Sequence, residues 1–169
     1  MGNVIEGYGH YKLDQPSEML QGHSEKVKYK SLLSLSVKRV TSEFLVIGIE
    51  KRMFDVYLAA VPDNDLLGQV VLNTRAARNE YDQATESIEH VGSRIVELLL
   101  QKYVDAFVEK ESPGIEKHVR LEDDLGNSIT VMYDSETVFV HYDSASLNQV
   151  LNQMREKKRE QELKTLEKL

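Results

Sequence analysis

The sequence contains no cysteine and no long apolar run. Without cysteine there is no disulfide framework, no thiolate nucleophile and no cysteine-based metal site. The longest clean apolar run, Phe44–Ile49, is far shorter than the ~20 residues that a membrane span needs. Residues 1–6 have neither the basic nor the apolar region of a signal peptide, and Glu6 stands where N-myristoylation requires serine or threonine. We therefore expect a cytoplasmic protein with no membrane partner.

Motifs for catalysis and for cofactor or metal binding are also missing. There is no Gly-x-Ser-x-Gly elbow, and Gly7-Tyr8-Gly9 lacks the strand and helix that flank a phosphate-binding loop. His118 and His141 are expected on strands roughly 9–10 Å apart, which is too far for both to bind one metal. The acidic segments 63–65 and 122–127 fail the EF-hand donor pattern and are typical of turns. We expect no catalytic residue, cofactor or metal, and the sequence does not favour an enzyme.

The chain is acidic, with a formal net charge of −7. This disfavours a nucleic-acid partner, because neutralising phosphates requires a basic surface. Lys26, Lys28 and Lys30 nevertheless share one face of an expected strand. One interpretation is a basic surface for phosphate, nucleic acid or an acidic partner. The interpretation that we favour is lysine protection of an edge strand against aggregation.

Residues 1–24 are expected to form a flexible N-terminal arm. They hold four of the nine glycines together with Pro16, and they show no sustained hydrophobic period. Terminal segments of this kind commonly fray or lie loosely on the surface. The alternative is an arm that docks on a partner through its apolar and aromatic side chains, which are Val4, Ile5, Tyr8 and Tyr11.

Alternation of apolar and polar residues predicts two antiparallel three-stranded meanders, either as separate sheets or within one mixed sheet. In the first meander, turns are expected at Thr41-Ser42 and at Lys51-Arg52. Its middle strand is apolar on both faces, which is typical of a strand covered on both sides. The expected strands are 26–38, 43–50 and 53–61 in the first meander, and 117–122, 128–133 and 136–142 in the second.

A long central helix is expected between the meanders. Residues 66–72 fit either a short strand or one helical turn, after which Asn73 or Thr74 can cap a helix. Apolar residues from Ala77 to Leu98 follow a strict four-three spacing, which predicts a narrow stripe that fits another helix. The stripe widens further on, and residues 112–114 end the helix. Gly92 is expected at a kink or a close helix contact.

A second helix is expected to end the sequence. Asp143 or Ser144 caps it, and the apolar positions from Leu147 to Met154 face inward. Residues 155–162 contain no apolar side chain, and leucines resume at Leu163. A helix end without core-facing residues projects into solvent or reaches a partner.

These elements predict an α+β fold in the order βββ-α-βββ-α. We expect one domain over residues 25–154, between the arm 1–24 and a projecting extension 155–169. The leading hypothesis is a non-enzymatic interaction module, such as an adaptor, inhibitor, chaperone or assembly factor, that binds another protein and itself. The alternatives are a small hydrolase-type enzyme with an acid and histidine site, or a nucleic-acid binder that uses the lysine face. The residues expected to bind a partner are Tyr8, Tyr11, Lys26, Lys28, Lys30, Leu163 and Leu166.

Overall fold

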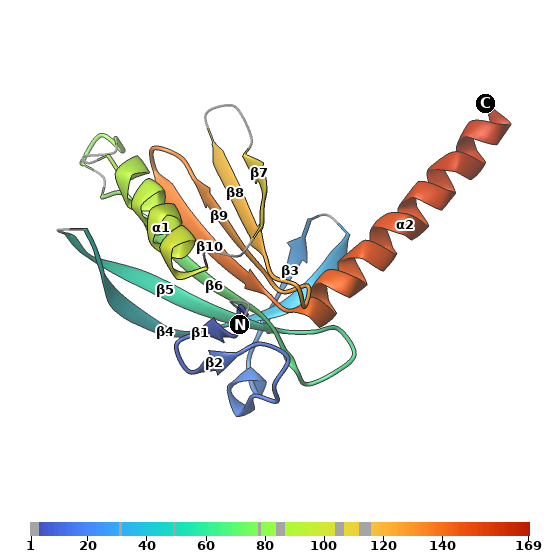
Figure 1. Ribbon diagram of the computed structural model, residues 1–169, viewed down its shortest axis with the longest axis horizontal. Coiled ribbons are helices and arrows are strands. Elements are labelled where there is room, and N and C mark those ends of the chain that lie inside the picture. Colours follow the sequence, from blue (N-terminus) through green and yellow to red (C-terminus); the bar gives the residue numbers. More distant parts are fainter. Residues whose placement is uncertain are drawn as a thin grey trace.

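The computed structural model describes residues 4–30, 32–48, 50–77, 79–83, 87–103, 107–111 and 116–169. Over these residues the chain has a mixed α+β fold, with an eight-stranded sheet, a two-stranded hairpin and two α-helices (Figure 1). The elements in chain order are β1 (Gly7–Tyr8), β2 (Tyr11–Lys12), the 3-10 turn η1 (Glu18–Leu20), β3 (Glu25–Tyr29), β4 (Leu33–Ile47), β5 (Glu50–Ala60), β6 (Leu67–Arg75), α1 (Glu89–Lys102), β7 (Phe107–Glu111), β8 (Lys117–Glu122), β9 (Ser128–Tyr133), β10 (Thr137–Asp143) and α2 (Ala145–Lys168).

The large sheet consists of two meanders joined at their last strands. Its strand order is β3-β4-β5-β6-β10-β9-β8-β7, and every pairing between neighbours is antiparallel. The predicted α+β class is confirmed. The predicted arrangement is wrong in two respects, because each meander has four strands and the two form one antiparallel sheet instead of a mixed one.

The long strand expected over residues 26–38 is in fact a hairpin. β3 ends at Tyr29, the chain turns through Lys30, whose φ is +50°, and β4 begins at Leu33. Tyr29 lies opposite Leu33, so paired residues in this hairpin are both odd or both even. The alternation of apolar and polar residues therefore passes through the turn without a change of phase, and periodicity could not reveal the turn.

The turn expected at Thr41-Ser42 is a β-bulge within β4. The register shifts between Arg39 and Thr41, and the strand then continues. A bulge adds one residue to one strand, so the side chains beyond it switch faces and imitate a turn in the sequence pattern. The chain turns instead at Gly48, whose φ of +64° favours glycine. Lys51-Arg52, the second expected turn, lies inside β5.

The prediction of a long central helix is wrong at both ends of that helix. Asn73, an expected cap, lies in β6, which makes the ambiguous segment 66–72 part of a strand, and α1 begins only at Glu89. Phe107–Glu111 is a strand, and the helix stop expected at 112–114 lies outside the described residues. The stripe before α1 consists of alanine and tyrosine, and helices of such weak amphipathic character depend on tertiary packing to form.

The second meander and the last helix follow the prediction closely. The strands expected at 117–122, 128–133 and 136–142 correspond to β8, β9 and β10 to within one residue at each end. Ser144 caps α2, since its Oγ accepts a hydrogen bond from the N–H of Leu147 at 3.0 Å. Local patterns were sufficient here because each element is bounded by strong turn or cap residues.

Helix α1 packs directly on the sheet at Gly92. A Cβ atom added at Gly92 would stand 2.2 Å from the ring of Tyr133, so a larger residue would force the helix away. The close contact expected at this glycine is therefore made with a strand. Val91 and Ile95, which belong to the stripe expected to fit another helix, are buried in this chain's own core.

Hydrophobic cores lie on both faces of the sheet. The larger core lies under α1 and includes Phe54, Val70 and Val140 from three central strands. Side chains alternate across a strand, so their sequence neighbours point to the opposite face. There the first turns of α2 cover a smaller core, formed by Leu33, Leu35, Ala59, Val61, Leu147 and Leu151.

Residues 4–24, expected as a flexible arm, pack against the sheet over part of their length. The side chains of Ile5, Tyr11 and Leu13 are buried in the larger core. The N–H of Ile5 donates a hydrogen bond to Asp123 Oδ2 at 2.8 Å, which fixes this segment to the turn between β8 and β9. The segment is therefore part of the folded body.

Candidate functional site

The two tyrosines expected to bind a partner make contacts within the molecule. Tyr11 is only 5% exposed. The hydroxyl of Tyr8 donates to Glu43 Oε2 at 2.5 Å, and its ring centre lies 6.0 Å from that of Tyr142. Burial, reinforced by the hydrogen bond to Glu43, raises the pKa of Tyr8, so the hydroxyl stays protonated. Both side chains thus hold the N-terminal hairpin to the sheet.

The expected lysine face lies along an edge of the sheet. Lys26 and Lys28 are exposed on β3, which ends the strand order. Lys30 lies in the following turn, with Nζ 5.3 Å from the centre of a tyrosine ring. Lys38 on the next strand donates from Nζ to the carbonyl oxygen of Gln21 at 2.6 Å. This placement fits lysines that oppose the addition of another strand.

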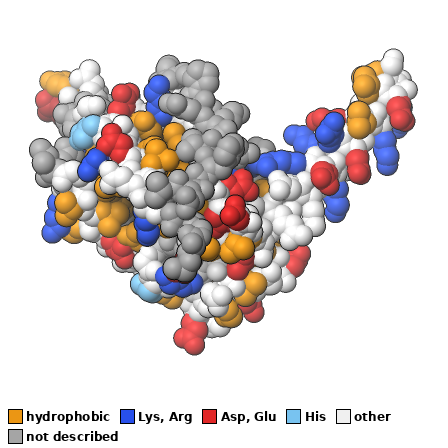
Figure 2. Space-filling model, in the orientation of Figure 1, with side chains coloured by type: hydrophobic (Ala, Val, Ile, Leu, Met, Phe, Trp, Pro, Cys, Tyr) orange, Lys and Arg blue, Asp and Glu red, His pale blue; other side chains and the backbone are white. Residues whose placement is uncertain are grey.

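The last part of the chain, residues 155–169, extends α2 away from the sheet; we call it the α2 tail (Figure 1). Every residue of the tail is exposed, and Met154 is the last side chain of α2 that packs against the smaller core. Leu163 and Leu166 are 51% and 66% exposed. Figure 2 shows basic and acidic side chains mixed along the projecting helix, with hydrophobic ones near its end.

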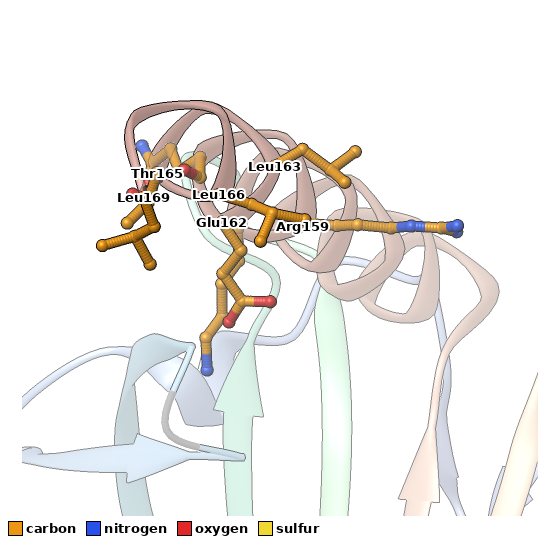
Figure 3. A pocket seen from close by; sticks show the side chains of 8 residues that line it. Arg159, Glu162, Leu163, Thr165, Leu166 and Leu169 are labelled. Atoms are coloured by element: carbon orange, nitrogen blue, oxygen red, sulfur yellow. Dashed lines mark hydrogen bonds between the residues drawn. The ribbon is translucent and has the colours of Figure 1, made fainter.

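The surface around the tail leucines is not an enclosed site. Figure 3 shows the side chains that border it, including Arg159, Glu162 and Leu163. All of them come from the last residues of this one helix, so within the described part of the chain no second element closes the space between them. The tail can offer a face to another molecule, but it cannot enclose a small ligand.

A cavity of about 270 Å³ lies on the sheet face opposite α1. Its floor consists of β6 and β10, and the β3–β4 hairpin forms its wall. The apolar lining includes Leu35, Val71 and Phe139, and Tyr57 adds a second aromatic ring. Polar lining comes from Asn73, Arg75 and Lys28 and from a cluster at one end that contains Tyr29, Gln69 and His141.

Asp143 organises the closed end of this cavity. Its carboxylate accepts a hydrogen bond from the Tyr29 hydroxyl at 2.5 Å and another from Gln69 Nε2 at 2.8 Å. Burial and the neighbouring Asp143 raise the pKa of Tyr29. The hydrolase alternative requires an acid and a histidine to converge, and His141 does lie nearby. Asp143, however, is 0% exposed, so its carboxylate cannot reach a substrate.

His141 forms part of the cavity floor as an uncharged ring. Its centre lies 5.9 Å from that of Tyr29 in a stacked arrangement and 6.2 Å from that of Phe139 in an edge-on arrangement. Burial lowers the pKa of His141, and this outweighs the opposing effect of Asp143. A neutral imidazole between aromatic rings acts here as an apolar, polarisable surface.

The residues that the sequence raised as metal candidates serve other purposes. Asp123 accepts hydrogen bonds from the backbone N–H groups of Leu125 and Asn127, and Asn64 accepts one from Leu66 N–H. These are turn contacts of the expected kind. Among the residues that the structure describes, no group of three or more histidine and acidic side chains is arranged to hold a metal ion.

The cavity residues were not recognised from the sequence. In β10, the sequence does carry a signal for the cavity. Phe139, His141 and Asp143 occupy the odd positions of the strand, on the face opposite to its buried valines. The β6 part carries the same signal in Gln69 and Asn73, but the sequence of residues 66–72 fits a helical turn as well as a strand. No local sequence pattern predicts that Tyr29 of β3 lies beside Asp143 of β10, because the two hydrogen-bonded residues are 114 positions apart.

Comparisons with models of protein families, with curated proteins and with solved structures gave no match for this chain. Among the described residues, no helix combines the length and apolar character required to cross a bilayer.

Proposed function

We propose that the chain is a non-enzymatic protein-interaction module, and that its α2 tail docks on a second copy of the chain. The observation that carries this proposal is the tail itself, where the helix continues after its last core contact and every side chain is exposed. Isolated helices of this length are marginal in water, so contact with a partner would stabilise the tail.

The charge pattern of the tail supports an intermolecular role. Arg155 and Arg159 stand four residues apart, as do Glu156 and Glu160. Each pair of like charges at this spacing weakens an isolated helix by a few tenths of a kcal/mol. The tail carries a formal charge of +2, which leaves −9 on the other residues of the chain. The basic tail of one copy is therefore attracted to the acidic body of another.

Exposed apolar side chains on the β4–β5 hairpin provide a second contact region. Phe44 and Met53 lie directly opposite each other, with 56% and 49% exposure, and Val46 is 71% exposed. Leu163 and Leu166 offer matching apolar area on the tail. Grouped apolar side chains on a surface mark interaction sites. If the tail of one copy packed on this hairpin in a second copy, the exposed apolar side chains of the tail and of the hairpin would both be covered.

Light scattering at micromolar concentration tests the proposal. We expect the full chain to have a mass above the 19.3 kDa of one copy. A chain that ends at residue 154 and the double variant Leu163→Glu, Leu166→Glu should both be monomeric. The matched control Gln161→Glu, Thr165→Glu adds the same charge to the same helix and keeps the leucines, so it should still self-associate. A monomeric full chain would refute the proposal of a second copy.

A further inference from the structure

Along its floor, the cavity beside β3 runs from a hydrogen-bonded polar end, through an aromatic middle, to a cation. Sheet register places Tyr57, Val71 and His141 in one row across β5, β6 and β10. The next row on the same face contains Asn73 and Phe139. Arg75 follows two residues later on β6, roughly 7 Å further along the strand. The closed end therefore leads through an aromatic floor to a cation at the mouth.

Asn73 is the unexplained polar group in this cavity. Its side chain lines the cavity and is 8% exposed, yet Nδ2 is buried with no hydrogen-bond partner among the described residues. A buried donor without an acceptor destabilises the folded state, so it indicates a missing partner. A half turn of the carboxamide exchanges the positions of its nitrogen and oxygen. After this rotation Nδ2 can donate a hydrogen bond to an acceptor in the cavity.

Two cations border the same space. Arg75 and Lys28 both line the cavity and are exposed, and neither side chain has an ion pair or hydrogen bond with the described residues. Asp55, which lies opposite Asn73 on the neighbouring strand β5, is already paired with Arg39 at 2.8 Å. A planar guanidinium pairs best with a carboxylate, which can accept two parallel hydrogen bonds.

We propose that this cavity binds a small aromatic carboxylate. The ring system lies over Val71 between the aromatic side chains of Tyr57 and His141, and the carboxylate meets Arg75 and the amide of Asn73. The volume of about 270 Å³ is below that of most drug-sized sites, so it suits a molecule of one or two rings. The site is separate from the α2 tail, so this proposal does not depend on self-association.

Chemical-shift titration of the full ¹⁵N-labelled chain tests the proposal with 2-naphthoate, and with 2-naphthamide as a neutral probe of the same shape. We expect 2-naphthoate to shift the amides around Val71, Asn73 and His141, and 2-naphthamide to bind clearly more weakly. Arg75→Gln, at an exposed position, should weaken 2-naphthoate about tenfold. The control Arg155→Gln removes an arginine from the tail and should leave the affinity unchanged.

A second variant separates ligand binding from folding. Asn73→Leu removes the unpaired donor and keeps a similar volume, so it should maintain or raise the free energy of unfolding while weakening 2-naphthoate. Three results would overturn the proposal. They are the absence of shifts around Val71 and His141 at millimolar 2-naphthoate, equal affinity for 2-naphthamide and 2-naphthoate, and an unchanged affinity for 2-naphthoate in Arg75→Gln.

Discussion

At the scale of single residues, His141 combines burial with a titratable ring. The charged and titratable groups that act on it are Asp143, which favours its protonated form, and Lys30 and His118, which disfavour it. Burial has the largest effect and lowers the pKa of His141 below its ordinary value of 6.5. The folded protein therefore holds this ring neutral at a pH where the unfolded chain already binds a proton.

The stability of the protein should consequently decrease as the pH falls below 6.5. Under those conditions His141 binds a proton more readily in the unfolded state than in the folded state, and this difference favours unfolding. Well above that pH both states are unprotonated at this residue, and the contribution is constant. Urea unfolding of the wild type and His141→Gln between pH 5 and pH 8 measures this. The variant should show a flatter pH dependence than the wild type. Parallel curves for the two proteins would contradict the expectation.

At the scale of elements, α2 divides into a packed start and an exposed tail. Leu147 and Leu151 lie in the smaller core, and Ser144 caps the first turn. Among the residues that the structure describes, no hydrophobic side chain beyond Met154 packs against either core. The first turns of α2 therefore stabilise the fold, whereas the tail does not contribute to these cores.

Removing the tail should leave the monomer's stability unchanged. A chain that ends at residue 154 should keep its free energy of unfolding within about 0.5 kcal/mol, because only exposed side chains are lost. By contrast, Leu151→Ala in the same helix should lower it by about 2–5 kcal/mol. Urea denaturation at sub-micromolar concentration, where association is negligible, gives both values. A large loss on truncation would show that the tail folds back on its own body.

Sequence patterns predicted the elements whose ends carry their own chemical signals. Strands β8 to β10 and the cap at Ser144 are of this kind. The β3–β4 turn has no glycine or proline, and its same-parity pairing concealed it. The bulge before Thr41 imitated a turn, and β6 carries polar residues on its cavity face that weakened its strand signal. The cavity itself depends on Tyr29 meeting Asp143, a contact that no local pattern encodes.

At the scale of the whole molecule, the N-terminal segment joins distant parts of the chain. Ile5 is 0% exposed within the larger core, and the Asp14 N–H donates to the carbonyl oxygen of Leu67 at 2.8 Å. Asp14 Oδ2 also accepts a hydrogen bond from the N–H of Ser146 at 3.3 Å. The segment thus contacts β6 and the first turn of α2 together.

Truncating the side chain of Ile5 should therefore destabilise the whole fold. Ile5→Ala removes a fully buried side chain and should lower the free energy of unfolding by about 2–5 kcal/mol. Its neighbour Val4 is 43% exposed, so Val4→Ala should cost less than about 1 kcal/mol. Thermal or urea unfolding followed by circular dichroism measures both variants. Similar small effects would mean that the segment is loosely attached.

The hydrogen bond from Ile5 to Asp123 has a consequence for how the protein is made. The two residues are 118 positions apart, and the contact between Asp14 and Ser146 spans 132. During synthesis, ribosomes add roughly 5–20 residues per second, so the segment that contains Ile5 and Asp14 waits several seconds for these partners to be made. Until then the apolar side chain of Ile5 has no finished core to enter. The nascent chain therefore exposes Ile5 until the strands that complete the larger core have been made.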